Sequence, residues 1–193
     1  MLSAEQIINY QAPSNCLKDR IIFITGAGDG IGKAAALACA QAGASIILAG
    51  RTVAKLEQVY DQIIDAELAE PTIYPINLEG AVADDYDALA VNLDQQFGRL
   101  DGLLHNAGIL GQRTPLSHYR QDVWDKVLQV NLTAPFQMTQ ALMPILEKSG
   151  DASVVFTSSG VGRTSRAFWG AYAVSKFAIE GMVQTWAAEL DGL

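Results

Sequence analysis

Short apolar runs alternate along the chain with longer segments in which apolar and polar residues recur at helical spacing. The runs are rich in aliphatic and β-branched residues and predict five strands, at residues 21–24, 45–49, 72–76, 100–105 and 153–157. The longer segments predict helices at residues 31–42, 53–68, 83–97, 122–148 and 171–190. Apolar strands separated by helices are typical of a parallel sheet that is covered on both faces. The pattern therefore predicts a doubly wound α/β fold.

A proline in the third predicted strand limits the possible strand orders of the sheet. Pro75 cannot donate a ladder hydrogen bond, so its strand belongs at a sheet edge. The Rossmann-type strand order 3-2-1-4-5 places the third strand at an edge. We therefore expect a Rossmann-type parallel sheet in this order. Residues 20–193 would form one domain, and residues 1–19 would be an N-terminal lead-in.

Composition and charge exclude several function classes. The chain has 193 residues, half of them hydrophobic, which fits one globular domain. Its formal net charge of −8 disfavours nucleic acid or an anionic membrane as a partner. No segment reaches the length of an uninterrupted apolar membrane span, so we expect a soluble cytoplasmic protein. The few sulfur and imidazole ligands share no metal-ligand spacing, and no metal site is predicted for Cys16, Cys39, His105 and His118.

A glycine-rich segment follows the first predicted strand and opens the first predicted helix. Its glycines would allow a tight turn and a close approach of the backbone to a pyrophosphate, which the amides of the helix N-terminus would bind. A flexible strand–helix connection is the alternative, but the order of strand, glycines and helix favours a dinucleotide site. The predicted cofactor-binding residues here are Thr25, Gly26, Gly28, Asp29, Gly30, Ile31 and Gly32.

The end of the second predicted strand bears on the choice of cofactor. An NAD-specific site would carry a carboxylate here for the ribose hydroxyls, but the sequence reads Ala-Gly-Arg-Thr over residues 49–52. No carboxylate would repel a 2′-phosphate, and the guanidinium of Arg51 could bind one. The segment predicts a preference for NADP(H) over NAD(H). The alternative is a solvated arginine at a helix start.

Tyr172 and Lys176 are four residues apart in the last predicted helix, so they share one helix face. An ammonium beside a phenol favours the phenolate form, which equips the tyrosine to exchange a proton with a substrate. Ser159 precedes this pair, after the fifth predicted strand. The pair alone is weak evidence for catalysis, and it becomes informative only together with the dinucleotide motif.

Taken together, these motifs resemble the short-chain dehydrogenase/reductase family over residues 18–190. The resemblance rests on residues 25–32 and 105–108 and on four polar residues, Asn131, Ser159, Tyr172 and Lys176. It implies that Tyr172 transfers a proton, that Lys176 assists it and holds the nicotinamide ribose, and that Ser159 binds the substrate oxygen. Asn131 would hold a water that relays protons towards Lys176.

The resemblance also implies further cofactor contacts and a reaction. Asn77 and Leu78 would lie by the adenine, and a segment after the fourth strand would back the cofactor through Asn106, Ala107 and Gly108. His105 stands where the family usually has asparagine, and we expect a core histidine. The implied function is an NADP(H)-dependent oxidoreductase that transfers hydride to or from a small carbonyl or alcohol substrate. The alternative is a catalytically inactive NADP(H)-binding sensor or scaffold.

Family members normally continue beyond the last predicted helix with further strands and a segment over the substrate. The sequence lacks these C-terminal strands, which would leave strand 153–157 as an open edge, so we expect a shortened or incompletely represented chain. For substrate contacts, the loop after Ser159 offers two aromatic and two basic residues, Phe168, Trp169, Arg163 and Arg166, although a solvated loop is equally compatible for the arginines.

The resemblance also implies an assembly. Helices 122–148 and 171–190 correspond to the pair through which the family packs against a second copy. We therefore expect a homodimer or homotetramer.

Overall fold

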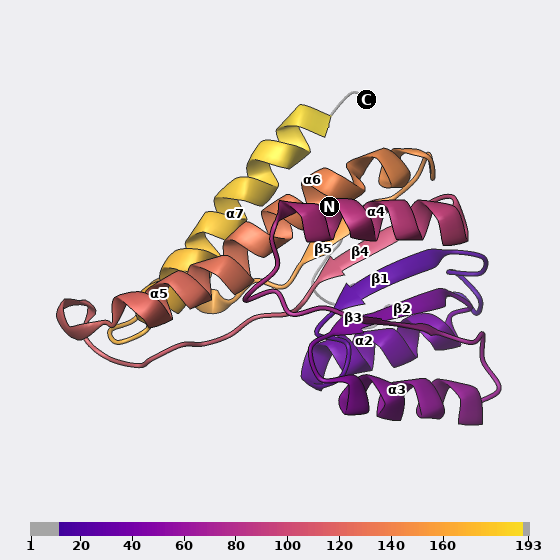
Figure 1. The fold of residues 1–193 in the computed structure, drawn as a ribbon, viewed down its shortest axis with the longest axis horizontal. Helices are drawn as coiled ribbons and strands as arrows, with labels where there is room; N and C mark the ends of the chain where they lie inside the picture. Colours follow the sequence, from indigo (N-terminus) through magenta and orange to yellow (C-terminus); the bar gives the residue numbers. More distant parts are fainter. Residues whose placement is uncertain (1–11, 191–193) are drawn as a thin grey trace.

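The computed structural model describes residues 12–190 and contains one parallel sheet. Its strands are β1 (Ile21–Thr25), β2 (Ser45–Gly50), β3 (Thr72–Pro75), β4 (Gly102–His105) and β5 (Ser153–Phe156). They pair in the order β3-β2-β1-β4-β5, every neighbouring pair in parallel (Figure 1). The predicted Rossmann-type fold and strand order are confirmed. The expected lead-in falls partly on residues 1–11, which lie outside the described residues.

Helices connect the strands and cover both faces of the sheet. They are α2 (Gly30–Gln41), α3 (Val53–Asp65), α4 (Ala83–Phe97), α5 (Gln121–Leu128), α6 (Ala134–Glu147) and α7 (Gly170–Leu190). Figure 1 shows α2 and α3 on one side of the sheet and α4 and α6 on the other. Short helical turns at η1 (Leu116–His118) and η3 (Gly160–Gly162) interrupt the two loops that follow β4 and β5.

The buried side chains form two hydrophobic clusters, one on each face. Successive strand residues point to opposite faces, so Phe23 packs towards α4 and α6 while Ile24 packs towards α2 and α3. Ile47 and Leu48 divide in the same way. This explains why the strands read as continuous apolar runs rather than as an alternating pattern.

The edge position of β3 agrees with its proline. Pro75 pairs in register with Gly50 of β2 and has no further strand on its other side. At the opposite edge, β5 leaves Val155 53% exposed. In the described part of the chain, β5 therefore forms the second edge of the sheet.

The helix predicted for residues 122–148 contains a wider turn. A π-helical segment, η2 (Gln129–Thr133), separates α5 from α6. The residue four positions after Asn131 is Pro135, which has no N–H to donate to the Asn131 carbonyl and would clash with it in a regular α-helix. We attribute the wider turn to this proline, which leaves the Asn131 carbonyl without an α-helical donor.

None of the helices within residues 12–190 is long and apolar enough to cross a membrane. The same residues contain no group of His, Cys, Asp and Glu side chains arranged to hold a metal ion.

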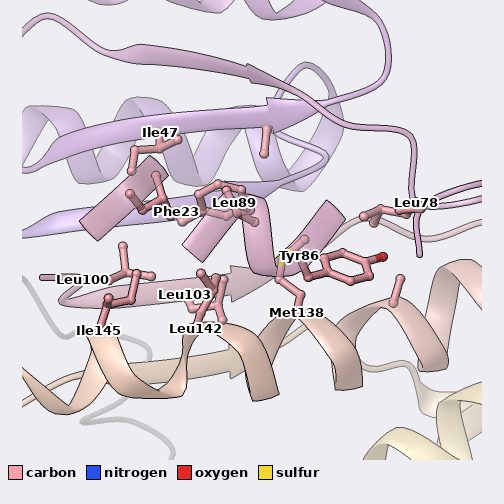
Figure 2. Close-up of a cluster of buried hydrophobic side chains, with 14 of the residues drawn as sticks. Phe23, Ile47, Leu78, Tyr86, Leu89, Leu100, Leu103, Met138, Leu142 and Ile145 are labelled. Carbon is pink, nitrogen blue, oxygen red and sulfur yellow. The ribbon is translucent and has the colours of Figure 1, made fainter. Parts of the chain in front are cut away.

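Tyr86 carries an unsatisfied polar atom in the core. Its ring is fully buried between α4 and Met138 of α6, and its hydroxyl has no hydrogen-bond partner among the described residues (Figure 2). Burial raises the pKa of the phenol to about 12, so the group is neutral. Because the hydroxyl loses its hydration without a replacement bond, we expect Tyr86→Phe to raise the free energy of unfolding by about 1 kcal/mol. Urea denaturation measures this change, and a loss of stability would contradict it.

Candidate active site

A cleft of about 350 Å³ opens at the carboxyl ends of β1 and β2. Nine of the residues predicted to bind the cofactor line it, namely Thr25, Gly26, Gly28, Asp29, Arg51, Asn77, Leu78, Ala107 and Gly108. Sheets of this topology bind ligands beyond the carboxyl ends of their strands, at the point where the strand order reverses. The cleft occupies that position, between the connections that leave β1 and β4 in opposite directions.

The glycine-rich loop turns tightly into α2. Asp29 caps the helix by accepting a hydrogen bond from the Gly30 amide at 2.8 Å, and it forms an ion pair with Lys55 of α3. A Cβ at Gly32 would collide with the carbonyl oxygen of Gly26 and with the Asn106 side chain. The close approach of helix and loop therefore requires glycine at position 32.

Thr25 joins this loop to the end of β4. Its hydroxyl accepts hydrogen bonds from the amides of Asn106 and Ala107, both at 3.0 Å, and it donates to the Leu104 carbonyl at 3.3 Å. The Asn106 side chain donates in return to the Thr25 carbonyl at 3.3 Å. These bonds brace the two strands that flank the cleft, and they place Asn106 behind the cleft rather than on its wall.

Three predicted residues of the loop, Gly30, Ile31 and Gly32, also lie outside the cleft wall. Gly30 begins α2, and Ile31 projects from its first turn with 67% of its surface exposed. Their predicted contact with a cofactor stays a prediction.

Lys176 lies where the cleft meets α7. Its ammonium donates a 2.6 Å hydrogen bond to the carbonyl of Thr157 and lies 5.6 Å from the ring centroid of Tyr172. A Cβ at Gly108, on the cleft wall, would lie 3.9 Å from this ammonium. Burial lowers the pKa of Lys176 below its ordinary value, because the charged form loses hydration. The lysine therefore connects the dinucleotide cleft to the predicted proton-transfer tyrosine.

Asn131 fixes the position of α7 and of the loop after β4. Its side-chain amide donates to the Ile109 carbonyl at 2.9 Å and to the Ser175 hydroxyl at 3.1 Å, and its oxygen accepts from the Ile109 amide at 2.8 Å. Ser175 in turn donates to the Tyr172 carbonyl at 2.7 Å. Both side-chain donors of Asn131 are thus engaged by protein atoms.

Ser159 begins the short turn η3 after β5. Its side-chain oxygen accepts from the Val161 amide at 3.4 Å, which leaves the hydroxyl proton available for another acceptor. The neighbouring Ser158 hydroxyl is buried and has no hydrogen-bond partner within residues 12–190.

A protein-family model described as short chain dehydrogenase matches residues 20–192. The chain belongs to this family. As a short-chain dehydrogenase, it is an oxidoreductase that acts on CH–OH or C=O groups with NAD(P).

Relatives and solved structures agree with this assignment. The chain is 48% identical to the uncharacterized oxidoreductase YciK of Escherichia coli over 94% of its own length and 72% of that protein. A solved chain from Pseudomonas syringae, described as a short chain dehydrogenase, is 53% identical with a TM-score of 0.94, over 96% of this chain and 76% of that one. A Shigella flexneri structure described as complexed with NADP is 47% identical with a TM-score of 0.89, over 92% of this chain and 74% of that one.

The short-chain dehydrogenase cleft also contains residues that sequence reasoning missed. Lys55, Glu79, Ile109 and Val130 all line it. Lys55 lies in the first turn of α3, shortly after Arg51, so a second cation close to the end of β2 was the signal that could have found it. The other three come from loops and from the π-helical turn, where no spacing rule applies.

His105 is a core residue, as predicted. It is 4% exposed, its Nε2 lies 2.8 Å from the Thr139 hydroxyl, and its ring stacks on Phe156 at 4.6 Å. The Thr139 hydroxyl donates to the Pro135 carbonyl, so Nε2 of His105 carries the proton in this pair. Burial lowers the pKa of His105 from 6.5 to about 3.

This burial predicts a loss of stability in mild acid. Between pH 6.5 and 3 the unfolded chain binds a proton at His105 that the folded chain does not, so stability falls as the pH drops through this window. The expected contribution is roughly 2 kcal/mol between pH 7 and pH 5. Urea denaturation of His105→Asn at both pH values should show a smaller pH dependence than wild type. The exposed His118→Asn is the control, and an equal pH dependence in His105→Asn would contradict the prediction.

Proposed function

We propose that this short-chain dehydrogenase transfers hydride between NADP(H) and a small carbonyl or alcohol substrate, with Tyr172 as the proton donor or acceptor. The observation that supports this most is the position of Lys176, next to Gly108 of the dinucleotide cleft and beside the Tyr172 ring. In the reductive direction, a bound nicotinamide supplies the hydride to the carbonyl carbon. Tyr172 gives its proton to the carbonyl oxygen, so the products are the alcohol and the oxidised cofactor.

Each remaining residue of the proposed tetrad has a role that its contacts support. The Lys176 charge stabilises the phenolate that remains on Tyr172 after proton transfer. The Ser159 hydroxyl, with its proton uncommitted, would donate to the substrate oxygen. Together with Tyr172 it would fix the direction from which the carbonyl faces the nicotinamide.

Asn131 would bind the relay water through its main chain. The side-chain donors are engaged with Ile109 and Ser175, whereas Pro135 leaves the Asn131 carbonyl without its α-helical donor. A water bound to this carbonyl would be available to return a proton to Lys176. Replacement of Pro135 by alanine would supply the missing donor. Solvent isotope effects on kcat would show whether the relay is disturbed, and an unchanged isotope effect would count against this role.

The cofactor end of the cleft supports NADP(H). Arg51 and Lys55 both line the cleft, and Lys55 is paired with Asp29, so Arg51 is the cation without an ion-pair partner among the described residues there. A 2′-phosphate would find a free guanidinium and no carboxylate directly after β2. The Shigella flexneri structure complexed with NADP makes the same cofactor reasonable for this chain.

The competing proposal is an inactive NADP(H)-binding sensor. It keeps the cleft but assigns no chemistry to Tyr172, whose ring is nevertheless held between Lys176 and Trp169 at 5.6 and 5.8 Å. Oxidation of NADPH and NADH measured against a panel of ketones, aldehydes and quinones separates the two proposals. Turnover of any panel member supports the enzyme, and tight NADPH binding without turnover across the panel supports the sensor.

We propose a homo-oligomer that uses the outer face of α7. Val174 and Phe177 on this helix are 41% and 45% exposed, and Phe136 of α6, whose ring lies 6.4 Å from that of Trp186 on α7, is 41% exposed. Apolar side chains gathered on one helical face are typical of an interface. We expect light scattering to give at least twice the monomer mass for wild type and a smaller mass for Phe177→Glu. An unchanged mass in this variant, with the fold intact by circular dichroism, would contradict the use of this face.

A further inference from the structure

Charge is distributed unevenly around the proposed site. The chain carries 21 acidic residues, yet residues 102–121 and 152–179 contain none. These two segments are β4 with its following loop, and β5 with its following loop and the first half of α7. They therefore surround the proton-transfer end of the site with cationic and neutral side chains, in a protein whose net charge is −8.

One arginine in these segments lies against an aromatic neighbour of the proposed catalytic tyrosine. The guanidinium of Arg113 lies over the indole of Trp169, 5.0 Å from the ring centroid, and the Trp169 ring lies 5.8 Å from that of Tyr172. Arg113 thus contacts an indole that packs, at a tilt of 49°, against the ring of the proton-transfer tyrosine. Where a guanidinium lies over an indole, the ring covers one of its faces while its N–H edges stay free to bind an anion.

The other arginines of these segments are less suited to this role. Arg120 is paired with Asp122 at 2.7 Å, and Arg163 lies 3.7 Å from Glu180. Arg166 is exposed, as Arg113 is, but no aromatic contact fixes it within the described residues. Arg113 forms no salt bridge in the described part of the chain, and it is the one in contact with Trp169, the aromatic neighbour of Tyr172.

Tyr119 holds the two loops together at this point. Its hydroxyl accepts a 3.1 Å hydrogen bond from the Gln112 amide, directly before Arg113, and its ring packs edge-on against Trp124 at 5.9 Å. A Cβ at Gly170, directly after Trp169, would collide with the Tyr119 ring, and one at Gly111 would collide with its hydroxyl. The phenol therefore fits between two glycines that precede Arg113 and follow Trp169. This contact fixes the register of the two loops.

We propose that Arg113, supported by Trp169, recognises an anionic group on the substrate, so that the preferred substrate is a carbonyl compound with a carboxylate or a phosphate near its reacting carbon. This inference rests on the proposed function, because it places the reacting oxygen at Tyr172. A guanidinium binds either anion through two parallel N–H bonds, so both sources remain to be compared. Tyr119 acts as a positioning residue.

Matched substrate pairs test this recognition. We would measure NADPH oxidation with short-chain 3-oxo acids against their methyl esters, and with dihydroxyacetone phosphate against dihydroxyacetone. Wild type should favour the charged member of at least one pair, through a lower KM. Arg113→Met should lower kcat/KM for that charged member by about tenfold to a hundredfold, the value of a charge-assisted hydrogen bond, and leave the neutral member unchanged. Arg113→Lys keeps the charge but loses the planar fork, so its kcat/KM for the charged member should lie between those of wild type and Arg113→Met.

A binding measurement separates this inference from the proposed function. Calorimetry of the NADP⁺-loaded protein with the oxo acid or the phosphorylated ketone reports affinity without turnover, and the exposed Arg166→Met is the matched control. The Arg113 inference alone would be overturned by three results together. The charged and neutral members would have equal kcat/KM, Arg113→Met would not change these values, and Tyr172→Phe would abolish turnover. Binding of the charged probe that depends on Arg113, without turnover of any pair, would overturn the proposed function alone. Absence of both binding and turnover would overturn both.

Discussion

Tyr172→Phe is expected to lower kcat by about a hundredfold to ten-thousandfold, the range that a positioned general acid contributes. The phenyl ring keeps its packing against Trp169 and its place beside Lys176, whose ammonium lies 5.6 Å from the Tyr172 ring centroid in wild type. Only the proton is lost. NADPH oxidation with a panel substrate measures the effect, and the NADPH dissociation constant, measured by fluorescence, should stay unchanged.

The control for this variant is a tyrosine with a hydrogen-bonded hydroxyl away from the site. Tyr60 donates to Glu70 at 2.6 Å on the surface of α3, and Tyr60→Phe should leave kcat unchanged. If Tyr172→Phe kept more than about a tenth of wild-type activity, the proton would come from another group and the proposed mechanism would be wrong.

Arg51→Glu is expected to weaken NADPH binding by about thirtyfold or more, because a free guanidinium is replaced by a carboxylate that repels the 2′-phosphate. The affinity for NADH, which lacks this phosphate, should stay the same or increase. The measurement is the ratio of the two dissociation constants in wild type and variant.

Arg166→Glu provides the same change of charge outside the cleft lining and should leave this ratio unaltered. An unchanged ratio in Arg51→Glu would show that Arg51 is only a solvated residue at the start of α3. In that case, Lys55, which also lines the cleft, would be the next residue to test.

Much of the fold could be predicted because its signals are local. A strand buried on both faces must be apolar throughout, as β1 and β2 are, and a proline in a strand must lie at an edge, as Pro75 does. The glycine-rich loop was recognisable for the same reason, since the close approach at Gly32 leaves no space for a side chain. Each of these constraints acts on a few consecutive residues and therefore appears in the sequence.

The features that escaped prediction depend on contacts between distant segments. The engagement of the Asn131 side chain with Ile109, and the insertion of Tyr119 between Gly111 and Gly170, join loops that are far apart in sequence. The π-helical turn has a local cause in Pro135, which lies in the interior of the segment predicted as one helix. The prediction for residues 122–148 followed the helical spacing alone and did not use this proline.

The hydrogen bonds that Asn106 donates to Thr25 and that Lys176 donates to Thr157 have a consequence for the enzyme cycle. Thr157 donates to the Asn106 side chain at 3.4 Å, so an unbroken polar path runs from the end of β1 through the ends of β4 and β5 to the ammonium. The ammonium is thus oriented by the folded sheet itself, before any dinucleotide arrives. The ammonium then needs little reorganisation during the reaction. Substitution of Thr25, although it is remote from the phenol, would therefore lower the rate of the chemical step as well as the affinity for the cofactor.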